Sequence, residues 1–147
     1  MKYSKFIKQE RACPFCKPKD RVFASNGSSY LTYAIAPYTK YHLLVIPKRH
    51  DMVFTEITPK EWKDLYAMLA VGAGVLRRKG ITEYTILLRN GNALGFGTGR
   101  SVEHLHLHIV PKHRIGDLER KGVERRVMSP KAIVKLTDEI TGMLKKK

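Results

Sequence analysis

The sequence has few acidic residues, only two cysteines and no long apolar run. Its 147 residues contain 13 Asp and Glu against 28 Lys and Arg, a formal net charge of +15. No apolar run approaches the roughly 20 residues of a membrane-spanning helix, so no membrane partner is expected. The basic N-terminal segment lacks the apolar stretch of a secretory signal. We therefore expect a soluble, cytoplasmic protein with one domain over residues 1–147.

The shortage of acidic residues leaves a strongly basic protein. This charge suits a partner that carries phosphate, either a small nucleotide or a nucleic acid. A basic surface that only keeps the protein in solution explains the charge equally well, because net charge bears on association and not on chemistry. A nucleic-acid partner is thus possible on this ground alone.

The two cysteines, Cys13 and Cys16, form the sequence Cys-Pro-Phe-Cys. In a cytosolic protein this spacing is more typical of a metal-binding knuckle or a redox pair than of a structural disulfide. It is also the spacing of two ligands of a structural zinc ion, which needs two more. Four histidines are candidates for them: His42, His50, His104 and His113. The alternative is a reduced cysteine pair without a metal.

Turn signals and apolar patterns predict a sheet with mainly antiparallel strands. Asn26 and Gly27, between the apolar segments 21–24 and 30–36, are typical of a β-hairpin. Further strands are predicted at residues 42–47, a strongly apolar run, at residues 84–89, and at residues 103–110, where the alternation is strict. No internal repeat or linker interrupts the chain.

Two segments have the signals of helices. For residues 58–80, Thr58 is the expected N-cap, Pro59 fits the first helical position, and Glu61 completes a capping box. A last helix is predicted from Ser129, its N-cap, to about residue 144. The sequence therefore predicts an α+β fold in a single domain, with a mainly antiparallel twisted sheet, one long central helix and a C-terminal helix.

The segment His104–Val110 reads HLHLHIV and is the most informative part of the sequence. A strand directs alternate side chains to opposite faces, so three histidines share one face and the apolar residues share the other. With six histidines in the chain, such a triplet arises by chance with a probability of roughly 1%. Neighbouring histidines would be ~6.6 Å apart along the strand, too far for one small ion to bind all three. We therefore expect catalysis by at least one of them.

Imidazole is a suitable nucleophile toward phosphorus. Its neutral form is abundant near pH 7, and the bond it forms to phosphorus is labile. A neighbouring histidine or a backbone carbonyl must then bind the other ring N–H and fix the tautomer. The three histidines are thus expected to divide the roles between them.

This segment resembles the H-x-H-x-H signature of the histidine-triad (HIT) superfamily. Pro37–His50, with its P-K-x-H end, is similar to another strand of the family, and Cys13–Cys16 resembles the zinc knuckle that opens many members. The resemblance extends from Cys13 to the last helix. The HIVPK ending and the PYTKYH stretch are most similar to the Fhit-like branch, which acts on dinucleoside polyphosphates.

The resemblance implies roles for individual residues. His106 would be the nucleophile that accepts a nucleoside monophosphate, His108 would bind phosphate oxygens, and Ser101 would position or protonate the leaving group. The glycine-rich loop would bring backbone N–H groups to the anion. Further contacts with the nucleotide are implied for His42, Asn90, Asn92, Gly99 and Arg100.

The resemblance also implies the metal ligands and shows one departure. Members that begin with Cys-x-x-Cys complete the structural zinc site with the residues that match His50 and His104. Such a site would clamp the N-terminal segment to the catalytic strand. The Fhit-like branch usually has Asp or Asn where this chain has Ala34, and that side chain holds the ribose hydroxyls. The ribose is then held less tightly or by another residue, or the substrate differs.

Together these observations predict a nucleotide hydrolase or transferase that cleaves a P–O or P–N bond through a nucleotidyl-histidine intermediate. Dinucleoside polyphosphates or nucleoside phosphoramidates are the expected substrates. Aprataxin-like removal of adenylate from nucleic-acid 5′ ends is one alternative, and a non-catalytic, zinc-stapled nucleic-acid-binding protein is another. By analogy with the family we expect a homodimer, for which the helix that contains Trp62 offers apolar surface.

Overall fold

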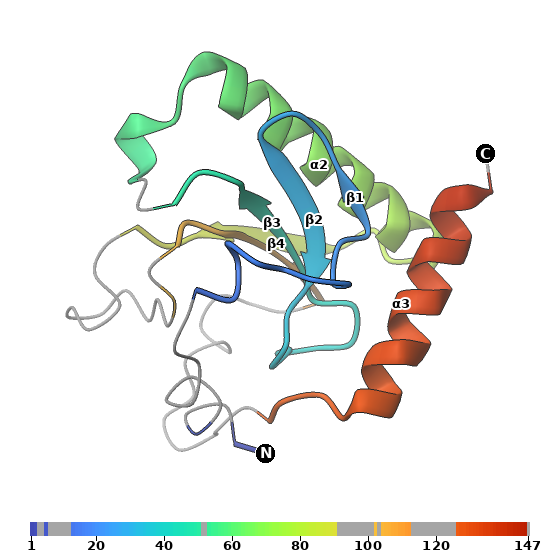
Figure 1. Cartoon of the computed structure of the whole chain (residues 1–147). Coiled ribbons are helices and arrows are strands. Elements are labelled where there is room, and N and C mark those ends of the chain that lie inside the picture. The colour runs from blue at the N-terminus through green and yellow to red at the C-terminus, as the bar shows by residue number, and fades with distance from the viewer. Residues whose placement is uncertain are drawn as a thin grey trace.

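The computed structural model of the chain describes residues 1–2, 5, 13–50, 53–90, 102, 104–112 and 126–146. Five strands in these residues form one antiparallel sheet in the order β1-β2-β3-β5-β4. The strands are β1 (Ala24–Ser25), β2 (Ser29–Tyr33), β3 (Leu43–Pro47), β4 (Tyr84–Leu88) and β5 (Leu107–Pro111). The helices are η1 (Phe54–Glu56), α2 (Pro59–Arg78) and α3 (Pro130–Lys145). The predicted α+β class with a central and a C-terminal helix is confirmed (Figure 1).

The central helix begins where its capping signals predict. The Thr58 hydroxyl accepts a hydrogen bond from the Glu61 amide, and the Glu61 carboxylate accepts one from the Thr58 amide. Gly80 follows the helix with φ +71°, a conformation that favours glycine. The ends predicted from sequence are therefore within two residues of the observed ones.

Two predicted strands were too long. The strand predicted for residues 30–36 ends at Tyr33, because the His42 amide donates to the Thr39 carbonyl of the turn and no longer bonds to β2. The strand predicted for residues 103–110 begins only at Leu107. There the ladder between β3 and β5 ends, since the carbonyl of Pro47 accepts from the His104 imidazole instead of from a backbone amide.

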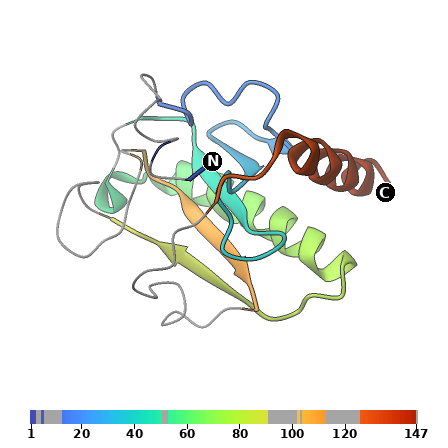
Figure 2. The ribbon, with the colours of Figure 1, turned by 90° about the horizontal axis from the view of Figure 1, so that it is seen from below.

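The two faces of the sheet differ in what covers them. Helix α2 packs on one face, where Leu31, Leu43 and Ile109 are fully buried with it in the main core (Figure 1). Helix α3 lies beside the C-terminal end of α2 and buries Ile140 in the same core (Figures 1 and 2). A smaller apolar cluster covers the other face, with Phe15, Tyr30, Ala34, Leu44, Ile46 and Val102 as its members.

Among the described residues, no helix combines the length and the apolar character that crossing a bilayer would require.

Candidate active site and metal cluster

His108, the histidine of β5, faces away from α2. His108 is paired with Leu44, whose side chain belongs to the cluster on the face opposite α2, while its neighbours Leu107 and Ile109 belong to the main core. His106 contacts the ring of Phe15, with the ring centroids 5.1 Å apart. The His106 and His108 centroids are 4.8 Å apart, and both residues are buried. The imidazoles of His106 and His108 therefore lie next to each other and are largely shielded from solvent. Together with His104 they form what we call the row of histidines.

A backbone carbonyl sets the tautomer of His106. Its Nδ1 lies 2.7 Å from the carbonyl oxygen of His104. A carbonyl only accepts hydrogen bonds, so Nδ1 carries the proton and the neutral ring has its lone pair on Nε2. This is the protonation state in which Nε2 can attack an electrophile.

A relay of two further bonds sets the tautomer of His108. The Tyr38 amide donates to Nδ1 of His42 at 3.2 Å, which places the His42 proton on Nε2. That atom lies 2.9 Å from Nδ1 of His108 and donates to it. The neutral His108 ring therefore carries its own proton on Nε2 and can donate it to an anionic oxygen. His42 is 1% exposed, and its direct contact with a nucleotide stays a prediction.

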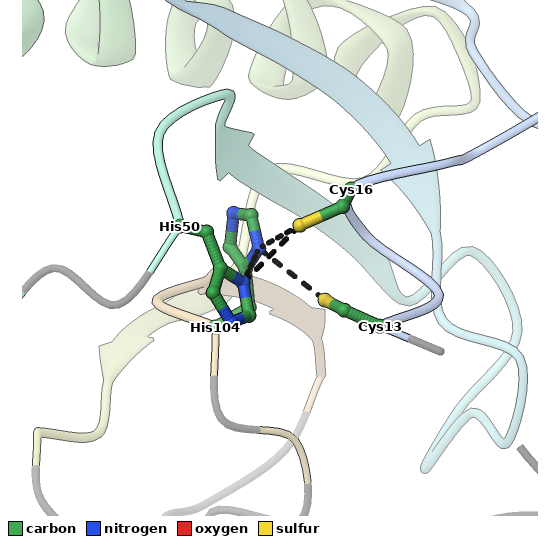
Figure 3. A group of neighbouring side chains, drawn as sticks. All are labelled: Cys13, Cys16, His50 and His104. Atoms are coloured by element: carbon green, nitrogen blue, oxygen red, sulfur yellow. Dashed lines mark hydrogen bonds between the residues drawn. The ribbon is translucent and has the colours of Figure 1, made fainter. Parts of the chain in front are cut away.

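Four side chains gather at the start of this row: Cys13, Cys16, His50 and His104 (Figure 3). Their potential ligand atoms all lie within 4.8 Å of one another. His104 Nδ1 is 3.1 Å from His50 Nδ1 and 3.4 Å from Cys13 Sγ, and Cys16 Sγ is 3.1 Å from His50 Nδ1. A tetrahedral ion with bonds of about 2.0–2.3 Å would separate its ligands by about 3.3–3.8 Å. These residues can therefore hold a metal ion.

The chemistry of His104 supports this interpretation. Its Nε2 lies 2.6 Å from the carbonyl oxygen of Pro47 and donates to it. The lone pair of the neutral ring is then on Nδ1, the atom that faces the cluster. A ring held by a hydrogen bond on one nitrogen and turned toward a metal site with the other is the usual arrangement of a histidine ligand.

Two sets of contacts hold the cluster in place. Tyr30 donates its hydroxyl to the Phe15 carbonyl, and Arg21 donates to the Pro14 carbonyl, which fixes the loop of the two cysteines. Burial raises the pKa of the Tyr30 phenol, so it stays protonated as a donor. On the other side, Arg49 next to His50 bonds both oxygens of Glu61. The side-chain hydrogen bond from Arg49 is the main reason why the Glu61 pKa falls to about 2.

The remaining predicted residues fall into two groups. Asn90 accepts a hydrogen bond from the Phe54 amide at 2.8 Å, a contact that holds η1. The others lie outside the described residues: Asn92, Gly99, Arg100, Ser101 and His113. Their roles stay predictions.

Sequence reasoning missed several contributors to the site. Phe15 packs against His106, and the Tyr38 amide begins the relay to His108. Phe15 had a usable signal, because it lies between two predicted metal ligands. A backbone amide such as that of Tyr38 has none.

Ala34, buried in the apolar cluster on the face opposite α2, also lines a cavity of about 180 Å³ beside the Pro37 turn.

Comparison with known proteins agrees with this geometry. The family model described as the HIT domain matches residues 17–115. The chain is 30% identical over 139 residues to the adenosine 5'-monophosphoramidase hnt1 of Schizosaccharomyces pombe, covering 91% of this chain and 99% of that protein. It is 31% identical over 113 residues to the Caenorhabditis elegans nitrilase and fragile histidine triad fusion protein NitFhit, covering 76% of this chain but only 24% of that longer protein.

A solved structure is similar over nearly the whole length. The Zn-bound histidine triad family protein from Mycobacterium smegmatis superimposes with a TM-score of 0.64 at 25% identity, covering 91% of this chain and 96% of that one. The fold, the row of histidines and the family model therefore lead to one conclusion: the chain belongs to the histidine-triad (HIT) family.

Proposed function

We propose that the chain is a nucleotide hydrolase or transferase in which His106 Nε2 attacks the phosphorus of a nucleoside phosphate. The observation that carries the proposal is the bond from His106 Nδ1 to the His104 carbonyl, which leaves the lone pair on Nε2. Attack forms an N–P bond and breaks the P–O or P–N bond to the leaving group, which departs with a proton. Water or inorganic phosphate then removes the nucleotide and regenerates the free imidazole.

The neighbouring groups suit this reaction. His108 directs a ring proton toward the face where phosphate oxygens would gain charge, and fixed donors of this kind stabilise a transition state strongly. The His104 carbonyl oxygen, which accepts the hydrogen bond from His106 Nδ1, stabilises the positive charge that the ring acquires on attack. Phe15 packs against the His106 ring and limits the orientations it can adopt.

The metal in this proposal is zinc, held by Cys13, Cys16, His50 and His104. Two thiolates and two imidazoles at tetrahedral spacing are a typical set for a structural zinc ion. The ion supplies no reactive ligand, because four protein ligands leave no open position. By binding the ion, the four ligands would instead hold the cysteine loop, which contains Phe15, against His104 and the row of histidines. The zinc-bound Mycobacterium smegmatis relative supports this choice of metal.

The substrates that we propose are adenosine phosphoramidates or dinucleoside polyphosphates. The Schizosaccharomyces pombe relative is named a monophosphoramidase, which favours the first class. Ala34 offers no polar side chain to a ribose, so recognition of the sugar must differ from that of the Fhit-like branch.

Intact-mass measurement after mixing the enzyme with adenosine phosphoramidate or diadenosine triphosphate tests the mechanism. We expect an added adenylyl group on the wild type that is lost in acid and stable in base. His106→Ala should show no adduct and lose several orders of magnitude of kcat, while it keeps its metal content and melting temperature. If His106→Ala retains activity within about tenfold, ~1.4 kcal/mol of barrier, the covalent mechanism is wrong. No turnover, together with salt-dependent oligonucleotide binding, would instead favour the non-catalytic alternative.

We further propose that the protein forms a homodimer through β4. This strand is at the edge of the sheet, and its Tyr84 and Ile86 are exposed. Beside them lies a mainly apolar groove of about 510 Å³, whose other wall is α2 with the exposed Tyr66. Antiparallel pairing of two identical edge strands is self-complementary about a twofold axis. Light scattering should give a dimer for the wild type and a monomer for Ile86→Lys; an unchanged dimer would exclude this interface.

A further inference from the structure

A strained turn places His42 beside the row of histidines. Tyr41, the residue before His42, has φ +64°, in the left-handed region that a bulky side chain rarely adopts. The His42 amide donates to the Thr39 carbonyl at 3.3 Å, and the His42 carbonyl accepts from Ala34 at 2.9 Å. Such a conformation persists only when surrounding contacts hold it, and it is most common at functional sites.

The contacts that hold this turn come mainly from α3 and from the residue that follows α2. Tyr41 donates its hydroxyl to Glu139 Oε1 of α3 at 2.8 Å. Glu139 also forms an ion pair with Lys79, directly after α2. The ammonium groups of Lys40 and Lys79 lie over the Tyr41 ring, 5.0 Å and 5.8 Å from its centroid. The hydrogen bond from Lys79 holds the pKa of the Glu139 carboxyl below its usual range, so it accepts as an anion.

The position of His42 matters because it must satisfy two partners at once. Its Nδ1 accepts from the Tyr38 amide while its Nε2 donates to His108. If the Tyr41 backbone relaxes to a common conformation, the His42 ring turns and loses one of these bonds. His108 can then place its proton on Nδ1, where it no longer faces a phosphate.

We infer that Tyr41 and Glu139 are positioning residues for His108, acting through the turn that carries His42. Helix α3 then does more than complete the core: one of its side chains determines which nitrogen of His108 carries the proton. This inference rests on the proposed function for its effect on turnover, but not for its effect on the histidine rings.

Three variants separate the contacts. Tyr41→Phe removes the hydroxyl alone, Glu139→Ala removes the acceptor, and Glu139→Gln keeps an oxygen for Tyr41 while it removes the charge. The matched control is Asp64→Ala. Asp64 also joins α2 to a turn, since its carboxylate accepts from Ser28 and Lys60, but that turn carries no histidine.

The first readout is the ring ¹⁵N chemical shifts of His42 and His108, which report the tautomers without any substrate. We expect one Nε2–H tautomer for both rings in wild type, Glu139→Gln and Asp64→Ala, and mixed tautomers for His108 in Tyr41→Phe and Glu139→Ala. The second is steady-state kinetics with adenosine phosphoramidate. Molecules with the wrong tautomer still bind, so kcat in the last two variants should fall in proportion to the fraction that keeps the Nε2–H form, about tenfold where about one tenth keeps it, while KM stays within about twofold.

The inference is overturned if Tyr41→Phe and Glu139→Ala keep the wild-type tautomers, or if Asp64→Ala lowers kcat as much as they do. The latter result would mean that any loss of stability slows the enzyme. If the wild type turns over no nucleotide, the proposed function fails, while the ring spectra still decide whether the turn positions His108.

Discussion

Adding a methyl group at Gly72 tests how closely α2 packs against β5, the strand that carries His108. A Cβ at this position would lie 2.6 Å from Ile109 Cδ1 and 3.2 Å from Leu31 Cδ1. Favourable carbon contacts are about 3.5–4.0 Å, so Ile109 must change its rotamer or β5 must move. Ile109 is fully buried and follows His108 directly. Gly74, on the same helix, is the control, because the described residues leave the space around its Cβ open.

The expected changes in the free energy of unfolding follow from two opposing effects. Replacing either glycine by alanine favours the helix by about 1 kcal/mol, whereas overpacking a core destabilises by typically ~1–3 kcal/mol. Gly74→Ala should therefore be about 1 kcal/mol more stable than wild type. Gly72→Ala should range from nearly unchanged to about 2 kcal/mol less stable. Urea unfolding, followed by far-ultraviolet circular dichroism, measures both. Equal stabilisation by the two substitutions would show that α2 does not press on Ile109, contrary to our packing argument.

Three further predictions concern the metal, the acid stability and the leaving group. The purified protein should contain about one zinc ion per chain, lost together with thermal stability in the Cys13→Ser, Cys16→Ser double variant; a native protein that is folded without metal contradicts this. Glu61 has a lowered pKa, so its stabilisation is present above its unfolded pKa of about 4.3 and is lost as the pH falls toward about 2. Glu61→Gln should reduce the acid dependence of the melting temperature between these values, and an unchanged dependence would refute the role of its bond with Arg49. Ser101, outside the described residues, should matter most for poor leaving groups; equal slowing of good and poor substrates by Ser101→Ala would exclude proton donation.

The features that sequence predicted well depend on residues close together in the chain. The start of α2 was predictable because Thr58 and Glu61 satisfy each other's backbone amides within one turn. The opposite faces of β5 followed from simple alternation. The joining of Cys13 and Cys16 with His50 and His104 came from the resemblance to a family, because short motifs do not say which distant residues meet.

The features that sequence missed depend on contacts across the fold. The relay to His108 joins His42 to a residue 66 positions away, and no local pattern identifies this pairing. The left-handed conformation of Tyr41 contradicts local preference, since tyrosine disfavours it. The late start of β5 has a similar origin. The His104 side chain replaces a backbone amide as the hydrogen-bond donor to the Pro47 carbonyl, and strand propensities do not predict such a replacement.

His104 explains why the candidate metal site and the proposed nucleophile share one segment of the chain. Its Nδ1 faces the two cysteines and His50, its Nε2 donates to the Pro47 carbonyl of β3, and its own carbonyl accepts from His106. The ring and the backbone of one residue are thus fixed from three directions. Since the His104 carbonyl determines which nitrogen of His106 carries the proton, any contact that immobilises the His104 ring also restricts His106. In the proposed mechanism the cluster would therefore help to fix the geometry of His106 Nε2, and His104 would take no part in the chemistry itself.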